Sequence, residues 1–510
     1  MAHDWRMASA SRWWTVLFVV LIVFARVIRV LFPQIWIEDE SYLNLSLLSS
    51  WGKAPYTDFP LPHPPLLELS MGQLFRFFGA TIHTAELITA SAVVVSAVLI
   101  ARLGARIAGL SVGLLAGVLY SFSPLLWRYH VMEREPFVVL FVVGAVHLLL
   151  ESEQRRLNWL RVLGAALLLA VAMAIKLTAA SAVLGGAAFF VWRRQWLRGL
   201  MLCALTLSLF ALLVAVLIRA NWLDAVASMF VFRLLHPADS WQNRIQNFSE
   251  VFSIVVYLGT LGTLFILVKK RGGLWALPLS VLGGCVAVMI ANPTFWLHNA
   301  IELLPWLSLA AAELCVSLAE RVPKIGIVHV LGPLTSAIGI ALLATWIVVA
   351  VRMPPQSWRF GRHGFGFRDR AELNEVARFV RSVTDRDDLV HAPSIVAFVA
   401  NRASLTPYPE LGGTLQGIVD SVRRVGVVST LRLSPLDPEL FWGVVFGYNK
   451  GQLMPKILDA IEHKRARAVV CRTDDELFPM GIVDLDQATL VESGYRNAFH
   501  SAHYDVWVPN

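Results

Sequence analysis

Long apolar runs fill the first two thirds of the chain, and short clusters of charged residues separate them. The runs cover residues 13–32, 84–100, 107–126, 136–150, 162–192, 199–218, 251–268, 274–291, 300–319 and 325–351. Because about 20 apolar helical residues cross a bilayer, this pattern predicts a polytopic α-helical membrane domain over residues 1–351. The first run lacks a small-residue cleavage site, so we expect it to remain as a span rather than be removed as a signal peptide.

Five basic clusters lie between the runs and predict the orientation of the spans. They are Arg102/Arg106, Arg155/Arg156/Arg161, Arg193/Arg194/Arg198, Lys269/Lys270/Arg271 and Arg321/Lys324. Lys and Arg accumulate in the cytoplasmic loops of membrane proteins. With all five clusters in the cytoplasm, the spans alternate correctly and the N-terminus is also cytoplasmic.

The run over residues 162–192 is the test of this scheme, because basic clusters flank both of its ends. A single span would place one cluster outside. Two spans return both clusters to the cytoplasm, although each is then only about 15 residues, or roughly 23 Å of helix. We therefore expect a short hairpin in a thinned part of the membrane, with Lys176 near its tip.

With this hairpin the chain has about eleven spans, and the odd number places residues 352–510 outside. That region has ordinary soluble composition. Helical spacing covers residues 371–384, and residues 388–390, 468–471 and 504–508 read as strands. The sequence predicts a multi-pass protein of the plasma (inner) membrane with a C-terminal extracytoplasmic mixed α/β domain.

Composition agrees with this division and excludes other classes. The chain is 56% hydrophobic and 16% charged, with a mean hydropathy of +0.61, whereas soluble domains are about 25% charged. The net charge of +8 comes with no basic, aromatic-interleaved stripe in the polar region, which argues against nucleic-acid binding. Of the four cysteines, only Cys471 lies in the polar region, so that region has no internal disulfide, and none has zinc-site spacing.

Three consecutive acids, Glu38, Asp39 and Glu40, follow the first span on its outer side. They could form a solvated turn at the membrane surface. Alternatively, one carboxylate could act as a general base that takes a proton from an acceptor hydroxyl. Because adjacent side chains point in different directions, at most one acid would meet the acceptor.

A proline-rich stretch with His63 follows and leads into residues 66–78. The apolar side chains of this segment, Leu67, Met71, Leu74 and Phe78, recur at helical spacing. We expect a helix in the plane of the membrane interface. A second short span here would break the alternation of the loops.

Four charged residues in the second outer loop are candidates for a site: Arg128, Glu133, Arg134 and Glu135. Charges beside a span often only anchor it. Two arginines and two glutamates exceed that need, and arginines on the outer face run against the usual distribution.

Lys176 is the sharpest anomaly, because a lysine at mid-membrane costs about 2.5–3.5 kcal/mol unless it reaches water or an anion. It could snorkel to the interface or contact a phosphate. His298 and Asn299, at the entry to a late run, could bind a lipid phosphate or cap the interface.

These motifs resemble the C-type (GT-C) membrane glycosyltransferases, and more narrowly the branch of protein O-mannosyltransferases and lipid A aminoarabinose transferases. The similarity extends over most of the chain. The matching segments are the acid motif 37–40, the G-x-x-P-Y-x-D-F stretch 52–59, the H-P-P-L stretch 63–66, Lys176, the H-N … L-P entry at 298–305, and segments 388–390 and 400–402.

The resemblance implies inverting transfer of a monosaccharide from a polyprenyl- or dolichyl-phosphate-linked donor to a hydroxyl of a protein, lipid or glycan. It implies that Asp39 is the base and Glu40 a supporting acid. The donor phosphate would meet Lys176 and either Arg128 or Arg134. The candidate donor-binding set also includes His63, Glu133, His298 and Asn299.

No residue is assigned to a metal, although a divalent ion is not excluded by the sequence. Three alternatives remain open at this stage: a transporter or lipid flippase, which would show paired repeats with broken helices; a diphosphate-donor oligosaccharide transferase; and a non-catalytic scaffold.

Overall fold

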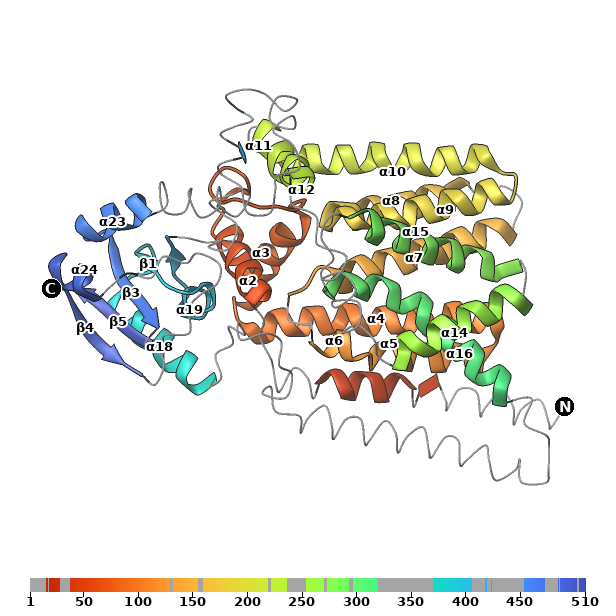
Figure 1. The fold of residues 1–510 in the computed structure, drawn as a ribbon, viewed down its shortest axis with the longest axis horizontal. Coiled ribbons are helices and arrows are strands. Elements are labelled where there is room, and N and C mark those ends of the chain that lie inside the picture. The colour runs from red at the N-terminus through yellow and green to blue at the C-terminus, as the bar shows by residue number, and fades with distance from the viewer. Residues whose placement is uncertain are drawn as a thin grey trace.

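A bundle of roughly parallel helices and a separate small sheet make up the computed structural model (Figure 1). It describes residues 15–16, 18–27, 37–128, 132–154, 159–218, 222–235, 254–269, 273–292, 297–319, 370–405, 418–419, 423, 454–472, 485, 487–501 and 504–510. Within these ranges, five helices are long and apolar enough to cross a membrane: Ile82–Ala108, Glu135–Ser152, Trp196–Leu217, Gly273–Ala291 and His298–Ala319.

The bundle helices follow the predicted apolar runs. They are Phe18–Val27, α4 (Ile82–Ala108), α5 (Leu110–Ser121), α7 (Glu135–Gln154), α8 (Trp159–Ile175), α9 (Ala180–Trp192), α10 (Trp196–Leu217), α14 (Ile254–Lys269), α15 (Ala276–Ala291) and α16 (Leu304–Ala319). The predicted run 325–351 lies outside the described residues.

Shorter elements join the bundle helices. They are α6 (Pro124–Arg128), α11 (Trp222–Val226), α12 (Phe232–Leu235), the 3-10 helices η1 (Leu177–Ala179), η3 (Gly273–Trp275) and η4 (Leu297–Leu303), and a π-helical turn, η2 (Ala227–Val231).

The predicted hairpin over residues 162–192 is confirmed. Helix α8 ends at Ile175, Lys176 has extended backbone angles (φ −153°, ψ 129°), and η1 leads into α9. Both helices are short, as the flanking charges require.

Two of the basic clusters meet at one end of the bundle. The carboxylate of Glu151 lies 3.1 Å from Arg106 and 3.2 Å from Arg161. This contact is consistent with both clusters facing the same side of a membrane, as the charge pattern predicts.

Glycines allow some helix pairs to approach closely. A Cβ atom on Gly259 of α14 would lie 2.6 Å from Cβ of Leu307 in α16, and one on Gly262 would overlap the carbonyl of Ala310. The α14–α16 contact therefore depends on two positions without side chains.

Helices α2 (Ile37–Ser50) and α3 (Leu66–Phe78) lie between the bundle and the sheet (Figure 1). The bounds of α3 match the prediction, but its buried face differs. Leu67 and Met71 are buried as expected, whereas Phe78 is 70% exposed and Glu68 and Phe75 are buried instead. The spacing of apolar residues could not predict that Glu68 is buried, because the partner of its carboxylate lies in a distant segment of the chain.

A five-stranded mixed sheet forms the C-terminal region, in the order β2-β1-β3-β5-β4. Strands β2, β1 and β3 are parallel, and β5 pairs antiparallel with both β3 and β4. The strands are β1 (Leu389–His391), β2 (Ala403–Ser404), β3 (Ala466–Arg472), β4 (Tyr495–His500) and β5 (Tyr504–Pro509), and the helices are α18 (Arg370–Val383), α19 (Ser394–Ala400), α23 (Met454–Glu462) and α24 (Gln487–Glu492).

The prediction of a mixed α/β fold for this region is confirmed. Helix α18 and strands β1, β3 and β5 were expected, while β2 and β4 were not. Alternation along the strands explains the two covered faces, since Val470 and Val506 belong to the core beneath α18, and Val469 and Trp507 pack with α23. All four cysteines are free.

The sheet region packs directly on α2 and α3. The rings of Phe75 in α3 and Phe398 in α19 lie 5.7 Å apart, and both side chains are buried. The guanidinium of Arg386 lies 5.5 Å from the centre of the Trp51 ring. Because residues 320–369 are outside the described ranges, the domain boundary at 351/352 stays a prediction.

We predict that Gly262→Ala lowers the melting temperature of the purified protein, because the added methyl overpacks the α14–α16 contact at a cost of about 1–3 kcal/mol. The control is Gly283→Ala in α15, where an added Cβ has nothing within 4 Å. Scanning fluorimetry in detergent measures both. Equal melting temperatures for the two variants would contradict the close-packing argument.

Candidate active site

Lys176 lies at the break between α8 and η1, and its side chain is buried at 5% exposure. Its ammonium donates to Glu135 and, at 2.6 Å, to Oδ1 of Asn299. A buried ammonium is tolerated only when it is paired and hydrogen-bonded. The extended backbone at Lys176 therefore places its ammonium inside the bundle, where Glu135 and Asn299 accept its hydrogen bonds.

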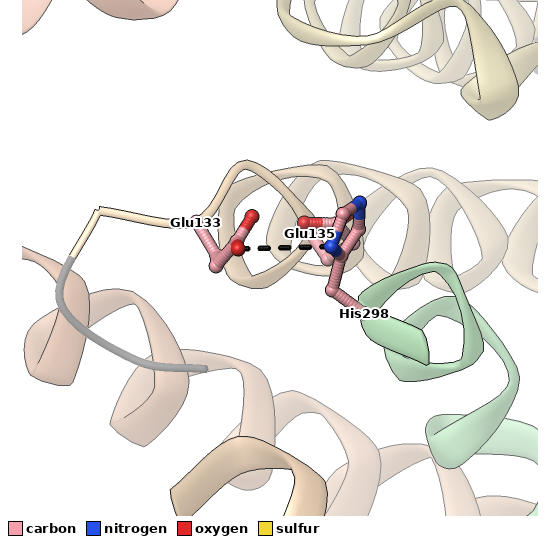
Figure 2. Close-up of side chains that lie close together, drawn as sticks. All are labelled: Glu133, Glu135 and His298. Atoms are coloured by element: carbon pink, nitrogen blue, oxygen red, sulfur yellow. Dashed lines mark ion pairs between the residues drawn. The ribbon is translucent and has the colours of Figure 1, made fainter. Parts of the chain in front are cut away.

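Glu133, Glu135 and His298 surround this lysine contact. Figure 2 shows the imidazole of His298, from η4, beside the carboxylates of Glu135, the first residue of α7, and Glu133, which precedes that helix. Nδ1 of His298 is 3.7 Å from Glu133, and Nε2 is 3.6 Å from Glu135. All three side chains are buried. The helix N-terminus favours an acid at Glu135, and Pro136 suits the first turn.

A second buried ion pair lies beside the first. Both Nη atoms of Arg134 donate to the Glu68 carboxylate, and Nη1 also donates to the carbonyl of Ile175 at 3.2 Å. Its guanidinium lies 4.4 Å from the centre of the Tyr42 ring. Burial raises the pKa of Glu68, and the charge of Arg134 opposes that rise. Arg134 thus ties α2, α3 and the end of α8 together.

His63 joins this network through an aromatic neighbour. Its Nε2 lies 3.2 Å from the hydroxyl of Tyr42, and its carbonyl accepts a hydrogen bond of 2.5 Å from the hydroxyl of Tyr56. Its place is therefore beside Tyr42, whose ring lies against Arg134.

The acid motif opens α2, one turn before Tyr42. The backbone at Asp39 and Glu40 is helical, and their side chains are outside the described part of the structure. The same holds for Arg128, the last residue of α6. Tyr42 contacts Arg134, which bonds to the residue before Lys176, so Arg134 links the helix that Asp39 opens to the lysine cluster.

The structure therefore brings five of the predicted site residues into one cluster: Lys176, Glu133, Glu135, His298 and Asn299. Arg134 and His63 belong to the adjacent network that contains Glu68. Three residues were given no role from the sequence, namely Glu68, Glu302 and Arg26.

Each of the three residues left without a role carried a signal in the sequence. Glu68 interrupts an apolar helix face, and Glu302 lies near the start of an apolar run. Arg26 lies within the first apolar run, where it is buried and donates to the carbonyl of Ser121. A charge in an apolar segment is a reason to look for a partner.

The comparisons with known proteins identify the fold. Residues 62–219, about a third of the chain, match the sequence model of the family described as dolichyl-phosphate-mannose-protein mannosyltransferase. Among solved structures, ArnT from Cupriavidus metallidurans bound to undecaprenyl phosphate superposes with a TM-score of 0.54 at 13% identity, covering 97% of both chains. The chain has the fold of a C-type membrane glycosyltransferase.

A second structure with this C-type fold is the apo oligosaccharyltransferase from Archaeoglobus fulgidus, with a TM-score of 0.51 and 12% identity. The match covers 91% of this chain and 69% of the other. The comparison with curated proteins found no match. Together the family match and the superpositions confirm the resemblance drawn from the motifs and the predicted fold class.

Three groups in this C-type fold have the donor atoms of a metal site. The ligand atoms of Glu133, Glu135 and His298 all lie within 4.8 Å of one another, and oxygen and imidazole donors suit several divalent ions. However, the ammonium of Lys176 already bonds to Glu135. A divalent cation about 4 Å from it would be repelled by about 8 kcal/mol at an effective dielectric constant of 20. The three side chains do not fit a metal ion while Lys176 is in place.

We predict that Lys176→Met creates a divalent-cation site. The variant should melt below the wild type, because it leaves Glu135 buried without its cation at a cost of about 3–5 kcal/mol. Mn²⁺ should then raise its melting temperature by several degrees and leave that of the wild type nearly unchanged.

The control is Lys176→Met combined with Glu133→Gln, which removes one ligand and should abolish the response to Mn²⁺. An equal Mn²⁺ response of wild type and Lys176→Met would show that the lysine does not exclude the metal.

Proposed function

We propose that the protein transfers a monosaccharide from a polyprenyl- or dolichyl-phosphate-linked donor to an acceptor hydroxyl, with inversion, on the extracytoplasmic side of the membrane. The observation that carries this proposal is the buried Lys176 cluster, which Arg134 links to the helix that the acid motif opens, in a chain with the C-type glycosyltransferase fold. The relative with 97% coverage was solved with undecaprenyl phosphate bound.

The chemistry needs one base and one phosphate-binding cation. The acceptor oxygen attacks the anomeric carbon while Asp39 takes its proton. The bond between that carbon and the phosphate oxygen breaks, and the electron pair leaves with the phosphate. Cations positioned at the leaving group stabilise its developing charge, so no strong general acid is required.

Lys176 suits the second role. An ammonium has three N–H donors, and two of them have acceptors on described residues, Glu135 and Asn299. The third serves a phosphate oxygen in this proposal. Because Glu68 already binds both Nη atoms of Arg134, we assign the second phosphate contact to Arg128.

The remaining candidates have supporting roles in the proposal. Glu40 orients groups near the base. His298 lies between Glu133 and Glu135 beside the donor headgroup, while His63 supports the Tyr42–Arg134 network.

A diphosphate-donor oligosaccharide transferase is the second candidate. The superposition with the oligosaccharyltransferase from Archaeoglobus fulgidus supports it, whereas the poor fit of a metal ion at Glu133, Glu135 and His298 counts against it. Activity that survives a chelator would exclude this candidate, and loss of activity that Mn²⁺ restores would favour it over the first.

We predict that Asp39→Asn lowers the rate of sugar transfer by about 10²–10⁴-fold, because the carboxamide cannot accept the acceptor's proton. The assay follows release of sugar from a purified polyprenyl-phosphate-sugar in detergent. Asp387→Asn, an exposed acid of the sheet region, is the matched control and should keep full activity. A well-folded Asp39→Asn variant with wild-type activity would remove Asp39 from the role of base.

The orientation of the chain is part of the proposal and has its own test. In a chain with its four native cysteines replaced by serine, Val491→Cys on exposed α24 should react with a membrane-impermeant maleimide in intact cells. Arg193→Cys, in the turn before α10, should react only after the membrane is permeabilised. The reverse pattern would place the sheet region in the cytoplasm.

A further inference from the structure

The 3-10 helix η4 presents two polar side chains to the lysine-bearing break. A 3-10 helix has three residues per turn, so side chains three apart lie one above the other. Asn299 and Glu302 of η4 are three apart, and both are buried. Asn299 accepts from Lys176 at 2.6 Å, and Glu302 accepts from the Thr178 hydroxyl at 2.5 Å.

These two hydrogen bonds join the same two segments. One segment is Lys176 and η1, between α8 and α9. The other is η4, more than 120 residues later in the chain. The hydrogen bond to Asn299 holds the Lys176 ammonium itself. The hydrogen bond from Thr178 to Glu302 holds η1, the turn that follows Lys176.

Glu302 has no evident role in contacting the donor phosphate, because two like charges in a dry site repel each other. It also lines a small cavity whose other walls are mainly apolar, including Val138, Val142 and Trp306. A carboxyl group in such a place is costly unless it is hydrogen-bonded. The hydrogen bond that Thr178 donates to Glu302 is therefore what makes the burial of this carboxyl group tolerable.

We propose that Thr178 and Glu302 form a positioning pair that fixes the Lys176 break against η4 and so holds the ammonium where a lipid-linked phosphate binds. Asn299 alone leaves η1 free to shift, and the ammonium then follows Glu135 instead of the phosphate. This inference depends on the proposed function only for the nature of the ligand, a phosphate on a polyprenyl chain.

The test measures binding of polyprenyl phosphate, without a sugar, to the purified full-length protein in detergent. Thr178→Val removes the hydroxyl and keeps the shape of the side chain, and we expect its Kd to rise about tenfold, as for loss of a hydrogen bond to a charged group. Glu302→Asp withdraws the carboxylate by one methylene and should have the same effect. Glu302→Gln keeps an acceptor oxygen and should bind nearly as well as the wild type.

Ser181→Ala is the matched control. Ser181 lines the same cavity and lies 3.4 Å from the sulfur of Cys285, outside the η1–η4 contact. We expect its Kd to equal that of the wild type, even where its melting temperature falls. Should Thr178→Val not fold, Glu302→Asp replaces it in the comparison.

The outcomes separate the two proposals. Wild-type affinity in both Thr178→Val and Glu302→Asp would overturn the positioning pair. A protein that binds polyprenyl phosphate and loses affinity in these variants, but transfers no sugar, would overturn the proposed function and leave the pair standing. Absence of binding by the wild type would overturn both.

Discussion

A lysine ammonium buried among helices is the constraint that organises the end of the bundle next to α2 and α3. A buried ion pair adds little net stability, yet removing one partner costs about 3–5 kcal/mol. The pairing of Lys176 with Glu135 therefore fixes where α7 begins, where α8 ends and where η4 must lie. In the adjacent ion pair, the charges of Glu68 and Arg134 neutralise each other. The two neighbouring ion pairs differ in their cation, which is a lysine in one and an arginine in the other.

Local pattern and charge counting predicted the helices well, because span length and the positive-inside rule act on short segments. The hairpin around Lys176 came from the charges at its ends. Partners distant in sequence could not be predicted in this way. Arg134 was expected to be available for a phosphate, and only the fold shows Glu68, 66 residues earlier, bound to it. Strand β4 was missed because most of its residues are exposed or half-buried, so little apolar alternation marks it.

The proposed site has two parts that differ in how they are built. Lys176, Glu135 and Asn299 come from helix breaks and helix starts, where the backbone leaves regular geometry and side chains turn inward. The acids of α2 lie instead at the start of a helix outside the bundle. Their position relative to the lysine depends on Tyr42, whose ring meets Arg134.

The contact between Phe75 and Phe398 has a consequence for how such chains diverge. Because α19 packs on the pair of helices that begins with the acid motif, the sheet region cannot be exchanged independently of those helices. A different domain joined at this point would need an aromatic side chain of similar size at the position of Phe398. Without it, a cavity would remain beneath α3. Lineages that exchange the sheet region by recombination should therefore carry paired changes at Phe75 and Phe398.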